Sequence, residues 1–166
     1  RFPQLSHNLY LRPDVHVYIE DGRSFIRRST EKFQVLQATL VDTWASTAAG
    51  AFALSENNLY TTDAFHDYLS HLTDDGVVVF TRWGFEPPRE SLRLISIAME
   101  ALRQLGETAP ASHVIVGRAG GVQGWGAKDT VLISRKPLAA GDVERARALF
   151  AAAGMQAVYL PGSETR

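Results

Sequence analysis

Residues 73–80 read TDDGVVVF, a turn followed by four consecutive apolar residues. A short run of this kind, rich in valine and bounded by turn residues, is typical of a strand buried on both faces. Such strands occur in sheets that carry helices on both sides. The segment therefore predicts a central strand of an α/β protein.

The chain before this strand alternates between strand and helix patterns. Residues 14–19 and 33–40 have strand patterns, and residues 22–29 between them favour a short helix. Four apolar residues ahead of the turn have the helical spacing i, i+3, i+4 and i+7, namely Phe65, Tyr68, Leu69 and Leu72. Strands separated by helices predict parallel pairing through crossover connections.

The chain after the central strand continues in the same way. A long helix follows residues 86–90 and ends before Gly106, and a last helix is capped by Asp142 and ends at Gly154. Three further strands are expected, at 113–117, 130–134 and 157–160. We expect a single domain with a doubly wound, mostly parallel sheet that has an antiparallel strand pair in its C-terminal part.

Composition and charge exclude several classes of function. With 45% apolar and 21% charged residues, the chain is typical of a globular domain, and its net charge of −1 offers no basic surface for nucleic acid. Cysteine is absent, which excludes disulfides and thiolate chemistry. No apolar run reaches the roughly 18 residues of a membrane-spanning helix. We expect a cytoplasmic segment that contacts neither nucleic acid nor membrane.

Two stretches carry a resemblance to a known family. VHVYIEDGRSFIRRSTEKFQVLQATLVDTW (15–44) and SENNLYTTDAFHDYLSHLTDDGVVVFTRW (55–83) resemble the spermidine synthase-like family of class I S-adenosylmethionine-dependent transferases. Some members carry membrane-spanning segments ahead of this domain. The resemblance covers residues 13–161 and matches only the second half of the catalytic domain. It implies a truncated domain, with residues 1–13 as the remnant of a helix and a linker.

The resemblance also implies an activity for the parent protein. That activity is transfer of an aminopropyl or methyl group to a small-molecule amine, from decarboxylated S-adenosylmethionine or S-adenosylmethionine, as in polyamine biosynthesis. The family's glycine-rich turn and ribose-binding acid are not found before Val15, so we expect this segment alone to bind no cofactor firmly and to be inactive. The alternative is a non-catalytic binding or assembly module that retains the fold, so whether the chain serves an enzyme stays open.

Asp21 and Gly22 are the candidate cofactor-binding residues. The resemblance implies that Asp21 accepts a hydrogen bond from the adenine amino group and that Gly22 lets the backbone approach the ring. A carboxylate is an acceptor without a donor of its own, which suits an exocyclic amine. The other interpretation is that Asp21 only caps the helix that follows.

Asp42 is the candidate catalytic residue. Spermidine synthases have two acids in this segment, one that deprotonates and orients the attacking amine and one that helps to bind the polyamine. By register Asp42 matches the second acid, whereas Thr39 stands in place of the first. This departure weighs against aminopropyl transfer, and Asp42 as a loop acid that caps local amides is the equal alternative.

Three more residues are candidates for binding the substrate. Tyr60 and Trp83 could stack on a ligand or could pack a loop against the sheet, and Glu56 could supply polar contacts or belong to an ordinary turn. We expect no metal site, because His66 and His71 are five residues apart, outside the i, i+4 spacing that places two ligands on one helix face.

The resemblance predicts the order of the strands. The order expected across the sheet is 14–19, 33–40, 77–82, 130–134 and 113–117. Strand 14–19 would then either pair directly with strand 33–40 or leave an edge that a second copy of the chain closes. We therefore expect a homodimer formed at the exposed N-terminal edge.

Overall fold

The computed structural model describes residues 4–41, 58–121 and 126–163. It confirms the α/β class. Elements run along the chain in this order: η1 (Leu9–Leu11), α1 (Gly22–Arg28), β1 (Phe33–Thr39), α3 (Thr62–Ser70), β2 (Leu72–Trp83), α4 (Arg89–Gln104), η2 (Pro110–His113), β3 (Val114–Ala119), β4 (Lys128–Ser134), α5 (Ala140–Ala152) and β5 (Gln156–Tyr159).

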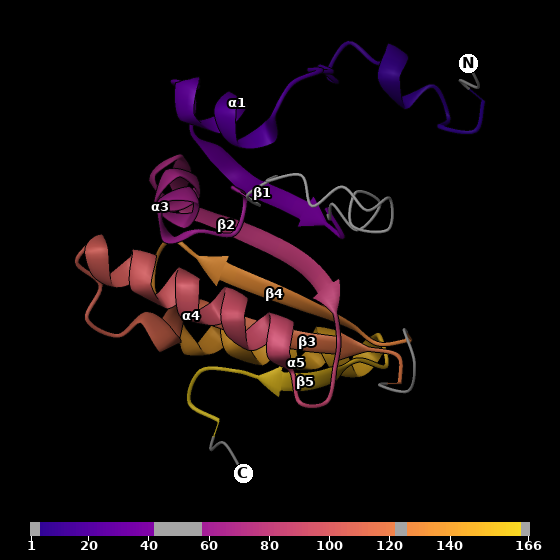
Figure 1. Cartoon of the computed structure of the whole chain (residues 1–166). Coiled ribbons are helices and arrows are strands. Elements are labelled where there is room, and N and C mark those ends of the chain that lie inside the picture. Colours follow the sequence, from indigo (N-terminus) through magenta and orange to yellow (C-terminus); the bar gives the residue numbers. More distant parts are fainter. Residues whose placement is uncertain (1–3, 42–57, 122–125, 164–166) are drawn as a thin grey trace, which may run out of the picture.

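The five strands form one open sheet in the order β1-β2-β4-β3-β5 (Figure 1). β1 and β2 are parallel, as expected for strands joined through the helix α3. The pairs β2–β4, β3–β4 and β3–β5 are antiparallel. Parallel pairing is therefore confined to the first two strands, and antiparallel pairing extends beyond the expected pair to all four strands from β2 to β5.

Helices cover both faces of the sheet. Ile26 of α1, Phe65 of α3 and Leu94 of α4 pack in one core against Val78 and Phe80 of β2. The other face is covered by α5, where Val143 and Phe150 pack around Ile115 of β3. β2 has a strand neighbour on each side. Its apolar run is fully buried on one face only, because Val78 and Phe80 are 2% exposed whereas Val77 and Val79 are half-buried, so the expected burial on both faces is wrong.

The helix ends follow local capping chemistry. Thr61 caps α3, its Oγ1 accepting the backbone N–H of Ala64 over 3.1 Å. Gly106 after α4 and Gly154 after α5 have φ of 91° and 64°, the left-handed conformation that ends a helix. The expectation for Asp142 is wrong in detail: Ala139 is the N-cap of α5, and Asp142 lies in its first turn, where a carboxylate suits the helix dipole.

The expected strand at 14–19 is absent. Residues 15–19 have no regular structure, and the side chain of Ile19 is 98% exposed. Within the described residues no strand lies beside them, and a strand forms only where its amides and carbonyls find partners. The direct pairing with strand 33–40 is therefore wrong. The relative order of the other four expected strands is confirmed, and the fifth strand is β5, at the opposite edge.

The long β2 contains an irregularity. Phe33 pairs with Leu72, but Val35 pairs with Val77, so residues 73–76 of β2 lie opposite a single residue of β1. This is the TDDG segment that we expect to be a turn, and it lies inside the bounds of β2 as a break in register. Among the helices that the structure describes, none has the length and apolar character needed to cross a bilayer.

Candidate functional site

The carboxyl ends of β1 and β2 meet at one edge of the sheet. Thr39, the last residue of β1, pairs with Thr81 of β2. The next residue, Leu40, has φ of 49°, so the chain turns sharply as it leaves the strand. In open α/β sheets, ligands bind beyond this edge of the strands. Two cavities lie there, one apolar and one polar.

The apolar cavity has a volume of about 400 Å³ and lies between α1, β1 and β2. Its walls come mainly from apolar side chains, namely Phe25, Leu36, Ala38, Leu59, Val78 and Phe80. Asp21, Gly22 and Thr39 also line it. Small-molecule sites are commonly concave and apolar with a few placed polar groups, so this cavity is the candidate site for a ligand with flat apolar faces.

Asp21 is the N-cap of α1. Its Oδ1 accepts the backbone N–H of Ser24 over 2.8 Å. Hydrogen bonds from the backbone and then the side chain of Ser24 lower the pKa of Asp21, so the group is an anion at neutral pH. The capping interpretation is confirmed. Contact with an adenine ring stays a prediction, because a carboxylate with one capping bond can accept further donors.

Gly22 follows Asp21 and is the first residue of α1. A Cβ atom built on Gly22 would meet no other atom within 4 Å. Packing within the described residues therefore does not require glycine at this position. The open space beside Gly22 leaves room for a ligand ring to lie close to the backbone, as the sequence resemblance implies.

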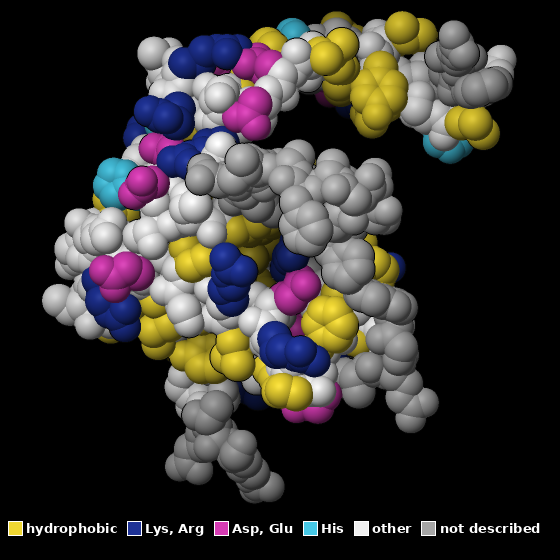
Figure 2. All heavy atoms as spheres, in the orientation of Figure 1, with side chains coloured by type: hydrophobic (Ala, Val, Ile, Leu, Met, Phe, Trp, Pro, Cys, Tyr) yellow, Lys and Arg dark blue, Asp and Glu magenta, His cyan; other side chains and the backbone are white. Residues whose placement is uncertain are grey.

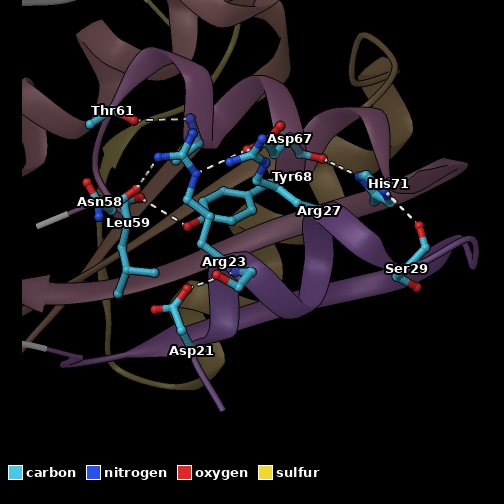
Figure 3. A network of polar contacts seen from close by, with 12 residues as sticks. Asp21, Arg23, Arg27, Ser29, Asn58, Leu59, Thr61, Asp67, Tyr68 and His71 are labelled. Carbon is cyan, nitrogen blue, oxygen red and sulfur yellow. Dashed lines mark hydrogen bonds and ion pairs between the residues drawn. The ribbon is translucent and has the colours of Figure 1, made fainter.

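Arginine side chains hold α1 against α3 beside the apolar cavity (Figure 3). The Nε of Arg23 donates to Asp67 Oδ2 over 3.1 Å, and its Nη1 donates to the carbonyl of Asn58 over 3.1 Å. Arg27 adds a longer ion pair of 3.8 Å to Asp67. These contacts fix the start of α1, and with it Asp21, relative to the segment that precedes α3.

Two further residues join the same helices. Burial raises the pKa of Tyr68, so its hydroxyl stays protonated and donates to the carbonyl of Leu59 over 3.2 Å. The ring of His71 lies between two backbone carbonyls, with Nδ1 2.7 Å from that of Asp67 and Nε2 3.1 Å from that of Ser29 (Figure 3). Sequence reasoning considered His71 only for metal binding and missed this connection, which has no local pattern.

The polar cavity, of about 500 Å³, lies between the start of α3, the end of β2 and the first turns of α4. At its centre the guanidinium of Arg82 lies 4.7 Å from the ring centroid of Tyr60 and donates to its hydroxyl over 3.0 Å. Arg82 Nη2 is also 2.6 Å from Oε2 of Glu90. This contact is an ion pair without the alignment of a hydrogen bond. Tyr60 in turn donates to the carbonyl of Val41 over 3.0 Å.

The structure brings only some of the expected site residues together. Tyr60 lines the polar cavity, while Asp21 and Gly22 line the apolar one. Trp83 ends β2 opposite Lys128 of β4 and lines neither cavity. Asp42 and Glu56 lie outside the described residues. The sequence analysis did not identify Arg82, although this residue lies in the TRW motif beside the candidate Trp83.

A buried ion pair lies on the far side of α4, between β3 and β4. Nε and Nη2 of Arg118 donate to the two carboxylate oxygens of Asp129 over 2.6 and 2.9 Å, and Ser91 Oγ donates to the same carboxylate over 2.6 Å. Asp129 is fully buried, and its hydrogen bonds raise the pKa of Arg118. Because every charge here is paired, the cluster is structural. In the described part of the chain, no group of three His, Asp or Glu side chains is suited to hold a metal ion.

Comparison with known proteins gives structural likenesses only. No family model matches the sequence, and no curated protein matches it. A spermidine synthase from Thermotoga maritima aligns with a TM-score of 0.48 at 16% identity, covering 88% of this chain and 43% of that one. A spermidine synthase in complex with the transition-state analogue AdoDATO aligns with a TM-score of 0.48 at 18% identity, with the same coverage. The chain thus spans less than half the length of either protein.

Proposed function

We propose that this chain is part of a spermidine synthase-like transferase and that its apolar cavity takes the adenine ring of S-adenosylmethionine or of its decarboxylated form. One observation carries the proposal: the cavity joins apolar walls to the carboxylate of Asp21 and to the open space beside Gly22. These are the residues to which the sequence resemblance assigns the adenine contacts.

The residues present fit such a ring. Leu36, Ala38 and Phe80 lie on one face of the sheet and supply apolar surface for the ring. Asp21 is held in place by its cap and supplies an ionised acceptor, which an exocyclic amine satisfies and a carbonyl does not. Arg23, bonded to Asp67 and Asn58, keeps this acceptor fixed. The site would therefore discriminate an amino-purine from an oxo-purine.

When bound, the cofactor supplies a sulfonium-linked carbon, to which an acceptor amine forms a bond as the carbon–sulfur bond breaks, sulfur keeping the electron pair and the amine losing a proton. Asp42, which matches the family's second acid by position, is our candidate for the carboxylate that binds the acceptor amine, and with Thr39 in place of the first acid it would also have to accept this proton. Tyr60 is our candidate for contact with the acceptor, because it lines the cavity next to the apolar one.

Adenosine and inosine test the adenine contact, since they differ at the exocyclic position that Asp21 would recognise. We expect adenosine to bind in the millimolar range, several-fold more tightly than inosine, in a titration followed by amide chemical shifts. Asp21→Asn keeps a capping oxygen but adds a donor, so it should abolish the preference for adenosine while the fold stays intact. Gly22→Ala should weaken the binding of both nucleosides, because the added methyl group would occupy the open space.

The outcomes separate the two roles of Asp21. Equal binding of both nucleosides to the unchanged chain, or an adenosine preference that survives Asp21→Asn, would leave Asp21 as a helix cap only. Gly141→Ala is a matched control, since Gly141 lies in α5, away from the cavity, and its added Cβ also meets nothing within 4 Å.

A further inference from the structure

Among the residues that the structure describes, more cationic than anionic side chains line the polar cavity. Arg82 and Arg93 contribute two positive charges and Glu90 one negative charge. Glu90 is already paired with Arg82. Arg93, one helical turn after Glu90 on α4, forms no hydrogen bond or ion pair with the residues that the structure describes and is exposed. Within the described lining, Arg93 therefore carries a positive charge that Glu90 does not neutralise.

The same cavity has an apolar side. Leu94 and Ile97 of α4 line it, and they lie on one helix face because they are three residues apart. Leu94 is 3% exposed. In Figure 2, Lys and Arg side chains lie beside hydrophobic ones over the first turns of α4. A ligand suited to both surfaces has a short aliphatic part and an anionic head.

The two cavities are neighbours. Phe80 lines the apolar cavity, and its ring centroid is 5.6 Å from that of Tyr60, which lines the polar one. A molecule in the polar cavity would lie next to a ligand in the apolar cavity. This arrangement suits the transfer of a chemical group from the ligand in the apolar cavity to the molecule in the polar cavity.

We infer that the polar cavity binds the carboxylate of a small aliphatic amino acid, held by Arg93 and Arg82, and that this molecule is the acceptor. Its role as acceptor rests on the proposed function, whereas its binding does not. Arg82 is already oriented by the ring and hydroxyl of Tyr60, so a guanidinium stands ready to meet a carboxylate.

A site that binds a carboxylate differs in charge from a site that binds a polyamine. A diamine carries a positive charge at each end, and one end would have to approach the guanidinium groups of Arg82 and Arg93, while the carboxylate of Glu90 is already paired with Arg82. Repulsion between the ammonium group of the diamine and the nearby guanidinium groups would disfavour its binding. Thr39, which lines the adjoining cavity where an acid is expected, also removes an attraction for a cationic acceptor.

A pair of probes of equal length tests the inference. 4-Aminobutyrate and 1,4-diaminobutane share the amine and the carbon chain and differ in one end group. We expect 4-aminobutyrate to shift the amides of the cavity residues with at least fivefold tighter binding than the diamine at low salt, and the difference to shrink as salt is added.

Variants of α4 locate the charge that is responsible. Arg93→Gln should weaken the binding of 4-aminobutyrate about fivefold. Arg93→Lys should restore part of the lost affinity, because Lys keeps the positive charge but lacks the planar guanidinium that can donate two parallel hydrogen bonds. Arg103→Gln is the matched control: it removes the same charge from the last turn of α4, some 15 Å away at 1.5 Å per residue, and should change nothing. Glu90→Gln, with folding checked by its thermal midpoint, should strengthen binding because it removes the negative charge of Glu90 from the cavity.

Each result decides for or against the inference. Tighter binding of the diamine, no binding of 4-aminobutyrate, or equal effects of Arg93→Gln and Arg103→Gln would overturn it. The proposed function is judged separately by adenosine, which Arg93→Gln should leave unchanged. Adenosine binding without 4-aminobutyrate binding would refute the carboxylate site alone, and the reverse would refute the adenine site alone.

Discussion

The Oδ1 atom of Asp21 accepts a hydrogen bond of 2.8 Å from the backbone N–H of Ser24, and the same side chain lines the apolar cavity. One carboxylate thus ends the irregular segment 15–19, starts α1 and presents a negative charge to a possible ligand. Its structural role exists without any ligand, so stability and binding can be tested apart.

The Asp21 cap predicts a pH-dependent contribution to stability. Asp21→Ala should lower the free energy of unfolding by about 1 kcal/mol, whereas Asp21→Asn should change it by only a few tenths, since Asn caps nearly as well. The folded-state pKa of Asp21 is lowered, so its contribution is full above the unfolded pKa of about 4 and is lost as pH falls through the folded pKa. Urea unfolding across acid pH checks this, and an equal acid loss in Asp21→Asn would contradict it.

Binding of S-adenosylmethionine to this chain should be feeble. A micromolar dissociation constant requires about 8 kcal/mol, and one charged hydrogen bond with a partly apolar ring site supplies only a fraction of that, roughly 1–3 kcal/mol for the bond. Calorimetric titration should therefore give an affinity weaker than micromolar. Micromolar binding would show that residues of this chain other than Asp21 and Gly22 hold the cofactor.

Breaking the buried ion pair of Arg118 and Asp129 should lower the free energy of unfolding far more than breaking an exposed ion pair. Arg118→Met leaves the fully buried Asp129 without its cation, which should destabilise the protein by about 3–5 kcal/mol. Arg12→Met is the control, because Arg12 and Asp14 form an exposed pair of 2.6 Å, and it should have no measurable effect. Chemical denaturation compares the two, and similar midpoints would mean that the buried cluster contributes little.

The outer edge of β1 should pair with a second copy of the chain. In the described residues β1 has a strand neighbour only in β2, and Val35 on it is 55% exposed. Such an edge offers unpaired backbone groups to another strand. Light scattering should show a concentration-dependent dimer, and Val35→Lys should weaken it. A monomer at every concentration would rule out this association.

Local patterns predicted most elements of the fold. The VVVF run identified an inner strand of the sheet, although only one of its faces is fully buried. The helical spacing around Phe65 identified α3, because burial of one helix stripe leaves a direct trace in the sequence. Gly106 and Gly154 marked helix ends, since a left-handed residue favours glycine. The expected adjacency of strands 33–40, 77–82, 130–134 and 113–117 came from the resemblance and is confirmed.

Residues 15–19 show why such patterns are insufficient. Their alternation is that of a strand, but a strand is completed by a neighbour, and no sequence window contains its partner. The sequence likewise proposed Asp21 and Tyr60 for the site but not Arg82, Glu90 and Arg93. The last three form one cavity only because β2 and α4 pack together.

What the sequence determined by itself is the α/β class, the inner strand at VVVF and Asp21 as a candidate cap of α1, all of which depend on residues a few positions apart. Only the tertiary structure decided that residues 15–19 form no strand, that Arg23 reaches Asp67 across 44 residues, and that Arg82, Glu90 and Arg93 line one cavity. The reason is physical. Capping and periodicity are satisfied within a turn or two of chain, whereas pairing, burial and the net charge of a cavity depend on groups brought together by the packing of distant elements.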